Sequence, residues 1–244
     1  MRIRCDPGSA QPIADCLKEA YEILEAADGD PSQIKDAVKI ASDQIAHLYH
    51  QQSIYSGSAA AIPHLFEFAS LADLQTKTFM LVMIACMDYD HAGAHAPGDL
   101  YAAYAVAIQD TYRLAVTLLE TTKLSNEQQD NLFEAVTLID NSFNFVIQNQ
   151  GCGNHACTGC KAELMVEFSN SRFTVNFQDG PSVTVEPPKD LNKEFEKERH
   201  RTLAKLYRIA RKGNQDSILK WLPQYPGTFT CPACKTVQQI DYER

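Results

Sequence analysis

The chain has 244 residues, of which 45% are hydrophobic and 22% charged, so it is long enough for one large or two modest globular domains. Its net charge of −9 is unevenly distributed. Residues 1–150 carry 8 Lys and Arg against 20 Asp and Glu, whereas residues 151–244 carry 14 against 11. The acidity of the first part argues against nucleic-acid contacts there, and any such contact is expected from the second part.

The sequence has the features of a cytoplasmic protein without membrane contacts. Its first residues lack the apolar run of a secretory signal, and the longest apolar stretch, residues 79–87, is too short to cross a bilayer. Clustered cysteines in that compartment favour metal binding, whereas the isolated Cys16 and Cys86 are expected to be buried.

Residues 1–150 carry the apolar periodicity of amphipathic helices. Asp30 is expected to cap the second helix, with Pro31 as its first residue, and residues 124–126 are expected to cap the sixth. Six helices with short connectors pack most simply as three antiparallel hairpins stacked in a solenoid, so domain 1–150 is predicted to be mainly α. The predicted helices cover residues 11–27, 31–50, 59–70, 74–87, 99–122 and 126–146.

After residue 150 the apolar period changes to two. Short β-rich segments at 162–168, 172–177 and 182–186 predict a three-stranded antiparallel sheet. A charged helix is expected over 191–211, ending at Gly213 in a left-handed cap, and a shorter helix is expected to stop at Pro223. Residues 151–244 are therefore predicted to form a small α+β domain.

Two Cys-x-x-Cys pairs enclose most of this domain. Cys157 and Cys160 form the first pair and Cys231 and Cys234 the second, and each pair runs directly into strand-like sequence, as in a zinc ribbon. The sheet and helices between the pairs would be a long insertion, which is tolerated because closure entropy grows slowly with loop length. Four thiolates would close the coordination of a structural Zn²⁺ and leave no open position for catalysis.

Two alternatives remain open for these cysteines. The pairs could be unrelated thiol pairs or redox dithiols, without a shared metal. Cys152 or His155, which lie just before the first pair, could also replace one of the four ligands.

Basic residues recur every four positions along the charged segment, here extended to residues 189–212. This spacing places them in one stripe along a single helix. Interleaved Asp and Glu neutralise much of the charge, so a solvated face is the favoured interpretation. The alternative is a nucleic-acid or anion surface beside the zinc ribbon, formed by Lys193, Lys197, Arg201 and Lys205.

Catalytic groups are harder to identify. One loop contains Asp88, Asp90, His91 and His95, but its Gly, Ala and Pro content fits a solvated connector better than a metal site. The sequence shows no activated nucleophile, open metal site or phosphate-binding loop. The chain is therefore predicted not to be an enzyme.

Three segments of the helical part carry a family resemblance: His50-Gln51, Tyr55-Ser-Gly-Ser-Ala-Ala-Ala-Ile-Pro63-His-Leu and Asp99-Leu-Tyr-Ala-Ala-Tyr104. Through them, residues 35–140 resemble a group of bacterial HEAT-like helical-repeat proteins, over somewhat under half of the chain. Some proteins of this kind also end in a zinc-ribbon-like knuckle such as residues 227–234. The resemblance implies a helical scaffold that binds other macromolecules, and it implies no catalytic residues.

The predicted function combines these features. A HEAT-like scaffold would bind a protein partner through its acidic surface, which suits a basic protein, and a zinc ribbon with structural Zn²⁺ would clamp the C-terminal end. The alternative is a nucleic-acid-binding zinc-ribbon protein that uses the basic helix 189–212. The second function predicts binding that weakens steeply with salt.

Overall fold

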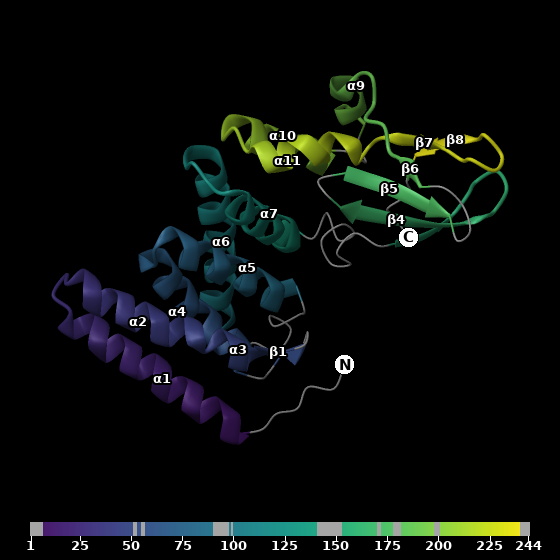
Figure 1. Cartoon of the computed structure of the whole chain (residues 1–244). Helices are drawn as coiled ribbons and strands as arrows, with labels where there is room; N and C mark the ends of the chain where they lie inside the picture. The colour runs from purple at the N-terminus through teal and green to yellow at the C-terminus, as the bar shows by residue number, and fades with distance from the viewer. Residues whose placement is uncertain are drawn as a thin grey trace. The chain divides into compact units, whose positions relative to one another are not determined.

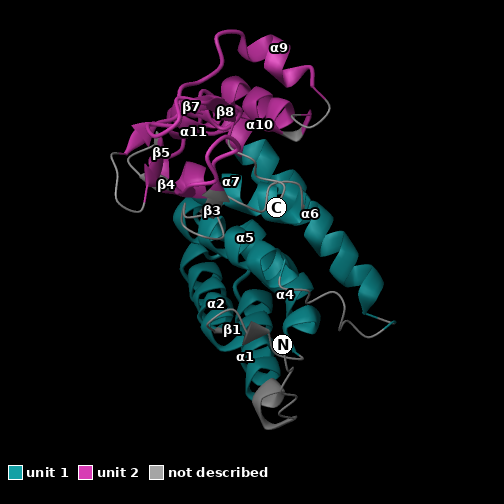
Figure 2. Ribbon diagram, turned by 90° about the vertical axis from the view of Figure 1, so that its right-hand side faces the viewer, with its two compact units in different colours: residues 1–118, 131–141 teal, residues 119–130, 142–244 magenta. Residues whose placement is uncertain are grey.

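The structure, a computed structural model, describes residues 7–50, 53–54, 57–89, 98, 100–140, 153–169, 172–177, 182–197 and 201–239. It consists of two compact units, which Figure 2 shows in different colours. Unit 1 contains Met1–Leu118 and Asn131–Asn141, and unit 2 contains Leu119–Asp130 and Ser142–Arg244. The predicted division into a domain 1–150 and a domain 151–244 stays a prediction.

Unit 1 is built mainly from helices. α1 packs against α2, α4 against α5, and α2 against α4. The predicted helices are present, although the second is interrupted at Gln44; the solenoid arrangement stays a prediction. The elements are α1 (Pro7–Ala26), α2 (Pro31–Asp43), α3 (Ile45–Leu48), β1 (Tyr49–His50), β2 (Ser53–Ile54), α4 (Ser58–Leu71), α5 (Leu74–Tyr89) and the larger parts of α6 (Tyr101–Thr121) and α7 (Asn126–Asp140) (Figure 1).

Two helix starts are capped where the sequence predicts. The Asp30 carboxylate accepts a hydrogen bond of 2.9 Å from the backbone N–H of Ser32, and Pro31 is the first residue of α2. Ahead of α7, Ser125 and Gln128 exchange hydrogen bonds between side chain and backbone, at 2.9 and 3.3 Å. This reciprocal pair is a capping box, and it satisfies two N–H groups that the helix start leaves unpaired.

Unit 2 contains a four-stranded antiparallel sheet in the order β3-β4-β5-β6. The three predicted strands correspond to β4 (Glu163–Ser169), β5 (Arg172–Phe177) and β6 (Val183–Thr184). β3 (Gly153–Ala156) was not predicted, because its residues Gly-Asn-His-Ala include none of the β-branched and aromatic residues typical of strands. A separate antiparallel hairpin is formed by β7 (Thr228–Thr230) and β8 (Val237–Gln239).

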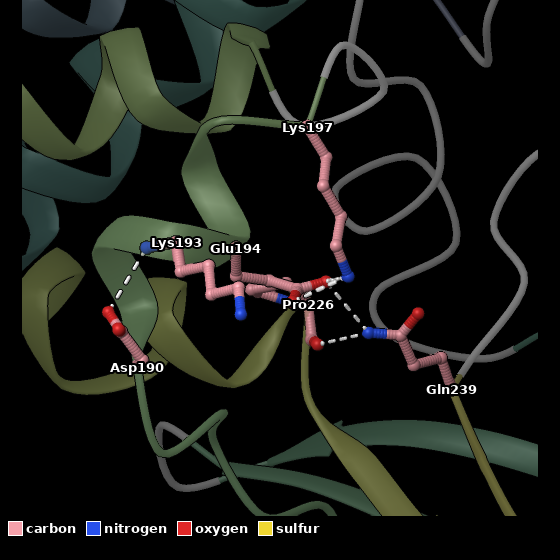
Figure 3. A network of polar contacts seen from close by, with 6 residues as sticks. All are labelled: Asp190, Lys193, Glu194, Lys197, Pro226 and Gln239. Atoms are coloured by element: carbon pink, nitrogen blue, oxygen red, sulfur yellow. Dashed lines mark hydrogen bonds and ion pairs between the residues drawn. The ribbon is translucent and has the colours of Figure 1, made fainter.

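The charged segment forms two helices, so the prediction of one helix over 191–211 is wrong. α9 (Leu191–Phe195) ends at Glu196, and α10 (Arg201–Lys212) begins after a break. Next to the break, Glu194 is buried, and its carboxylate accepts hydrogen bonds from the side chains of Lys197 and, from much later in the chain, Gln239 (Figure 3). These contacts fix α9 to the β7–β8 hairpin, and the chain leaves the helix within the next turn.

Aromatic packing joins the sheet to the helices that follow α10. The ring of Phe173 in β5 lies edge-on to Trp221 and Tyr225, with centroid distances of 6.2 and 6.1 Å. Trp221 ends α11 (Asp216–Trp221), and the 3-10 helix η3 (Leu222–Gln224) follows it. The Phe173 backbone N–H also donates a hydrogen bond of 3.1 Å to the side-chain oxygen of Gln224. Both packing and a hydrogen bond therefore fix the core of unit 2.

The end of α10 differs from the prediction. Asn214, not Gly213, has the left-handed backbone, with φ +52°. Gly213 is required for a different reason: a Cβ at this position would fall within the van der Waals radius of the Leu119 carbonyl oxygen. The prediction of a left-handed cap at Gly213 is therefore wrong, and the glycine serves the close approach of two backbones.

The segment Leu119–Asp130 supports the α10–α11 turn through side-chain contacts. Gln129 accepts a hydrogen bond of 3.0 Å from the Ser217 backbone N–H, which satisfies an unpaired group at the start of α11. The Ser217 hydroxyl donates 3.0 Å to Asp130, and Lys212 forms an ion pair of 2.6 Å with Glu120. The turn between α6 and α7 is thus part of the fold of unit 2.

Asp130 makes the stability of unit 2 depend on pH. Burial raises the pKa of Asp130 above its ordinary value, and the hydrogen bond from Ser217 offsets only part of this. The folded state therefore holds this proton more tightly than the unfolded state, so its contribution to stability falls as pH rises through the raised pKa. Because Asp130 also remains exposed to solvent, we expect Asp130→Asn, which keeps an acceptor for Ser217, to stabilise the protein only slightly at pH 7.

Urea unfolding of wild type and Asp130→Asn side by side checks this expectation. The gain should disappear near pH 3, where the wild-type carboxyl is protonated in both states. Comparing the unfolding free energies of the two proteins at each pH removes the pH effects of all other titrating groups, which both proteins share. A variant that is equally or less stable at pH 7 would contradict the burial argument.

Candidate metal centre

Each Cys-x-x-Cys pair lies in a tight turn with the same backbone geometry. In the first turn, the Cys157 N–H donates 2.8 Å to the Ala162 carbonyl, and the Lys161 N–H donates 3.0 Å to the Cys157 carbonyl. In the second turn, Cys231 and Thr236 form the first of these bonds, and Lys235 and Cys231 the second, both at 2.9 Å. The two segments therefore form matching knuckles.

The matching turns depend on one unusual backbone conformation in each. Lys161 and Lys235, which directly follow the second cysteine of each pair, have φ values of +63° and +62°. A left-handed conformation costs a non-glycine residue about 1–2 kcal/mol. Both turns contain this unfavourable conformation. The shared order Cys-x-x-Cys-Lys in the two pairs is the sequence pattern that corresponds to it.

The two knuckles bring all four predicted cysteines together, and their sulfur atoms lie within 4.8 Å of one another. Two of these separations join the knuckles: 3.6 Å from Cys157 to Cys234 and 3.8 Å from Cys160 to Cys231. Tetrahedral zinc with Zn–S bonds of 2.3 Å requires sulfur separations of about 3.8 Å. The cluster therefore has the size needed to hold one tetrahedral ion.

The cluster has a buried side and an accessible side. Cys157 and Cys231, the first cysteine of each pair, have no exposed surface, whereas Cys160 and Cys234 are solvent-accessible. The buried cysteines anchor the knuckles to the unit, and the accessible ones give an ion a path into the cluster.

Hydrogen-bond donors around the sulfurs favour thiolates. The N–H groups of Cys160 and Gly159 lower the pKa of Cys157, and the hydroxyl and N–H of Thr236 lower the pKa of Cys234 to about 6. At Cys160 the Ala162 N–H acts in the same direction, but desolvation and the neighbouring thiols outweigh it and raise the pKa to about 11. A divalent cation suits this set, because it balances the charge that four crowded thiolates would otherwise hold together.

The other predicted ligands remain predictions. Cys152 lies outside the described residues. His155 is in β3, where its backbone pairs with Leu164, but its side chain is not among those described. Of the cluster predicted to lie in one loop, Asp90, His91 and His95 likewise lie outside the described residues, whereas Asp88 lies in α5 and accepts a hydrogen bond from the Tyr104 hydroxyl.

The structure does not bring the four predicted basic residues into one stripe. Lys193 and Lys197 belong to α9 and the turn after it, whereas Arg201 and Lys205 belong to α10. Lys197 is held by Glu194 through contacts of 2.6 and 2.7 Å, as Figure 3 shows. The residues therefore do not lie along a single helix as predicted, and their contact with a nucleic acid or another anion stays a prediction.

A shorter basic row lies along α10 itself, within the segment 189–212 that the sequence marks as basic. The helix contains no acidic residue, and its row follows the helical spacing of four, three and four. On the opposite side, Leu203, Leu206 and Ile209 are buried in unit 2. The exposed row consists of Arg201, Lys205, Arg208 and Lys212.

Unit 1 contains an apolar cavity that the sequence did not indicate. Its volume is about 420 Å³, and residues of α1 and α4, including Leu17 and Ala61, form its walls. At one end the Tyr21 hydroxyl contacts Glu67 and lies 2.9 Å from His64 Nδ1. Burial and then the Glu67 hydrogen bond raise the pKa of Tyr21, so the phenol stays protonated and acts as a hydrogen-bond donor.

No family model matches the chain, and neither does any curated protein or solved structure. The resemblance to HEAT-like repeat proteins therefore stays a prediction. Among the helices of the described residues, none is both long and apolar enough to cross a membrane. The case for a function rests on the chemistry of the cysteine cluster and on the charge of the surfaces.

Proposed function

We propose that the chain is a non-enzymatic interaction protein whose unit 2 is held by a structural zinc ion. The observation that carries the proposal is the four-cysteine cluster, with cross-knuckle sulfur separations of 3.6 and 3.8 Å. Cys157, Cys160, Cys231 and Cys234 would bind the ion as thiolates. Four thiolates in a tetrahedral arrangement suit Zn²⁺ better than harder ions such as Mg²⁺ or Ca²⁺.

The proposed role of the zinc is structural because of the ligand number. A catalytic zinc keeps one coordination position for water or substrate, whereas four protein thiolates fill the tetrahedron. The ion would instead join two segments that are more than 70 residues apart in sequence. The zinc ion would therefore contribute to the free energy of folding. The function itself is assigned to the surfaces of the folded protein.

The proposed partner of the helical part is a protein, and the charge favours a basic one. Residues 1–150 carry 20 acidic against 8 basic side chains, which attracts cationic surfaces and repels nucleic acids. Affinity capture with the full chain from native lysate tests this proposal. We expect a stoichiometric protein partner that dissociates more readily as salt increases. The absence of a stoichiometric partner at both low and high salt would contradict it.

A second candidate function follows from α10. Its row of Arg201, Lys205, Arg208 and Lys212 has no acidic residue within the helix, although Lys212 also pairs with Glu120, and such a row suits the phosphates of a single-stranded nucleic acid. Like charges at these spacings also weaken the helix by about 0.2–0.5 kcal/mol per pair, a cost that a bound polyanion would remove. This surface replaces the longer stripe predicted over 189–212.

Charge reversal distinguishes the basic row on α10 from the longer stripe predicted over 189–212. We expect Lys205→Glu combined with Arg208→Glu to weaken oligonucleotide binding and to reduce the salt slope by about 1.4, since each single-strand phosphate contact contributes about 0.7. The control is Lys193→Glu on α9, which should leave binding unchanged. Fluorescence anisotropy with a single-stranded oligonucleotide at several salt concentrations measures both. Wild-type binding that is absent at low salt, or unaffected by the reversal, would exclude this function.

A further inference from the structure

The second knuckle holds the first one through a side chain that is not a metal ligand. The Oε1 atom of Gln238, in β8, accepts hydrogen bonds from the Thr158 backbone N–H at 2.8 Å and from the Thr158 hydroxyl at 2.9 Å. Thr158 lies inside the first Cys-x-x-Cys turn, 80 residues away in sequence. One amide oxygen therefore connects the two halves of the cluster.

The orientation of the Gln238 amide follows from these bonds. A backbone N–H requires an acceptor, so the oxygen, not the nitrogen, must face Thr158. Gln238 is 9% exposed, and its Nε2 has no hydrogen-bond partner among the described residues. An unpaired buried donor costs about 1–3 kcal/mol, so general stability alone does not explain a glutamine here. The position therefore suits the side-chain oxygen of glutamine, which accepts both hydrogen bonds from Thr158.

A second contact brings the knuckles closer at the same place. A Cβ on Gly159 would collide with the Thr236 hydroxyl and lie 3.0 Å from the Cys234 sulfur. Thr236 precedes Gln238 by two residues, and its hydroxyl lies 3.2 Å from the Cys234 sulfur. Thr158 and Gly159, which lie between the two cysteines of the first turn, thus contact β8 and the residue just before it, respectively.

We infer that Gln238 is a positioning residue for the metal centre: it fixes the first Cys-x-x-Cys turn against β8, so that Cys157 and Cys160 face Cys231 and Cys234. The inference rests on the proposed zinc site and adds a determinant of its affinity. Two knuckles from distant parts of the chain must otherwise be brought together at the expense of binding free energy. Because the Gln238 oxygen already holds the two knuckles together, the ion does not have to supply all of the free energy needed to order them.

The test uses Gln238→Met, which keeps the length of the side chain and removes both the acceptor and the unpaired donor. Outer contacts of metal ligands typically change affinity by about 10–100-fold, and we expect a loss in this range. Chelator competition on the full chain measures Zn²⁺ affinity. Titration with Co²⁺ should still show the absorption of a tetrahedral four-thiolate site, at higher cobalt concentration. Val237→Thr, at a neighbouring side chain that is 65% exposed, is the matched control and should bind as wild type does.

A double-mutant cycle tests the specific contact. Thr158→Val removes the hydroxyl donor and should weaken zinc binding in the wild-type background but not in the Gln238→Met background. Equal losses in both backgrounds would overturn the inference. So would a Gln238→Met protein that unfolds at a lower temperature but binds zinc as tightly as wild type, because Gln238 would then only support the fold. A wild-type chain that binds no zinc would instead refute the proposed function.

Discussion

Replacing Cys157 with serine is expected to abolish stable zinc binding and to destabilise unit 2 by several kcal/mol. The side chain is fully buried, and its sulfur lies 3.6 Å from that of Cys234 in the other knuckle. A serine hydroxyl is a poor ligand for zinc, and structural zinc sites contribute about 10–16 kcal/mol of apparent binding free energy at pH 7. Cys231→Ser, the equivalent change in the second knuckle, should have the same effect.

Elemental analysis and thermal unfolding measure this effect. Wild type should carry one zinc per chain, and both serine variants should carry none after dialysis. Limited proteolysis should then cleave residues 151–244 faster, while the helices of unit 1 keep their circular dichroism signal. Cys16→Ser, in α1 and far in sequence from either pair, is the control that should retain the metal. Unchanged zinc content and unfolding temperature in Cys157→Ser would show that the cluster does not organise the unit.

Among the described glycines of unit 2, Gly213 is expected to tolerate an added methyl group least. The added Cβ would overlap the carbonyl oxygen of Leu119, and a backbone atom cannot rotate away as a side chain can. The nearby Gln215 side chain, which donates to the same carbonyl, would lose its position as well. Either α10 or the end of α6 must shift, so we expect a destabilisation of about 3 kcal/mol or more.

Urea denaturation quantifies the change against a matched substitution. Gly98→Ala adds the same methyl group at a position where no atom of the described residues lies within 4 Å, and it should change stability by less than about 0.5 kcal/mol. Zinc content should be measured in parallel, because Gly213 lies outside both knuckles. A Gly213→Ala protein as stable as Gly98→Ala would mean that the two backbones are not in contact.

The cysteine cluster and the helices could be predicted from the sequence because their signals are local. Asp30 with Pro31 starts α2 as predicted, and the spacing of two cysteine pairs indicated a four-sulfur cluster that the structure brings together. The residues around the cluster could not be predicted. Gln238 is one of many polar residues in strand-like sequence, and only the folded chain places its oxygen 2.8 Å from the Thr158 nitrogen.

The wrong predictions share a physical origin in contacts between distant residues. Charges recurring every four residues suggested one long helix, but Glu194 is held by Gln239 from the far end of the chain, and the helix breaks beyond it. Gly213 suggested a left-handed cap, but the Leu119 carbonyl explains the glycine. In both cases the local pattern was compatible with the prediction, and a contact across more than 40 residues decided the outcome.

The membership of Leu119–Asp130 in unit 2 bears on how such a protein could have arisen. The chain passes from one unit to the other three times, after Leu118, Asp130 and Asn141. Recombination that transfers only a C-terminal segment would leave behind Gln129 and Asp130, the partners of Ser217 at the start of α11. The half that contains the cysteine cluster is therefore poorly suited to transfer between genes as an independent segment. Its ancestry should follow that of the helical half, and a relative that carries one should carry the other.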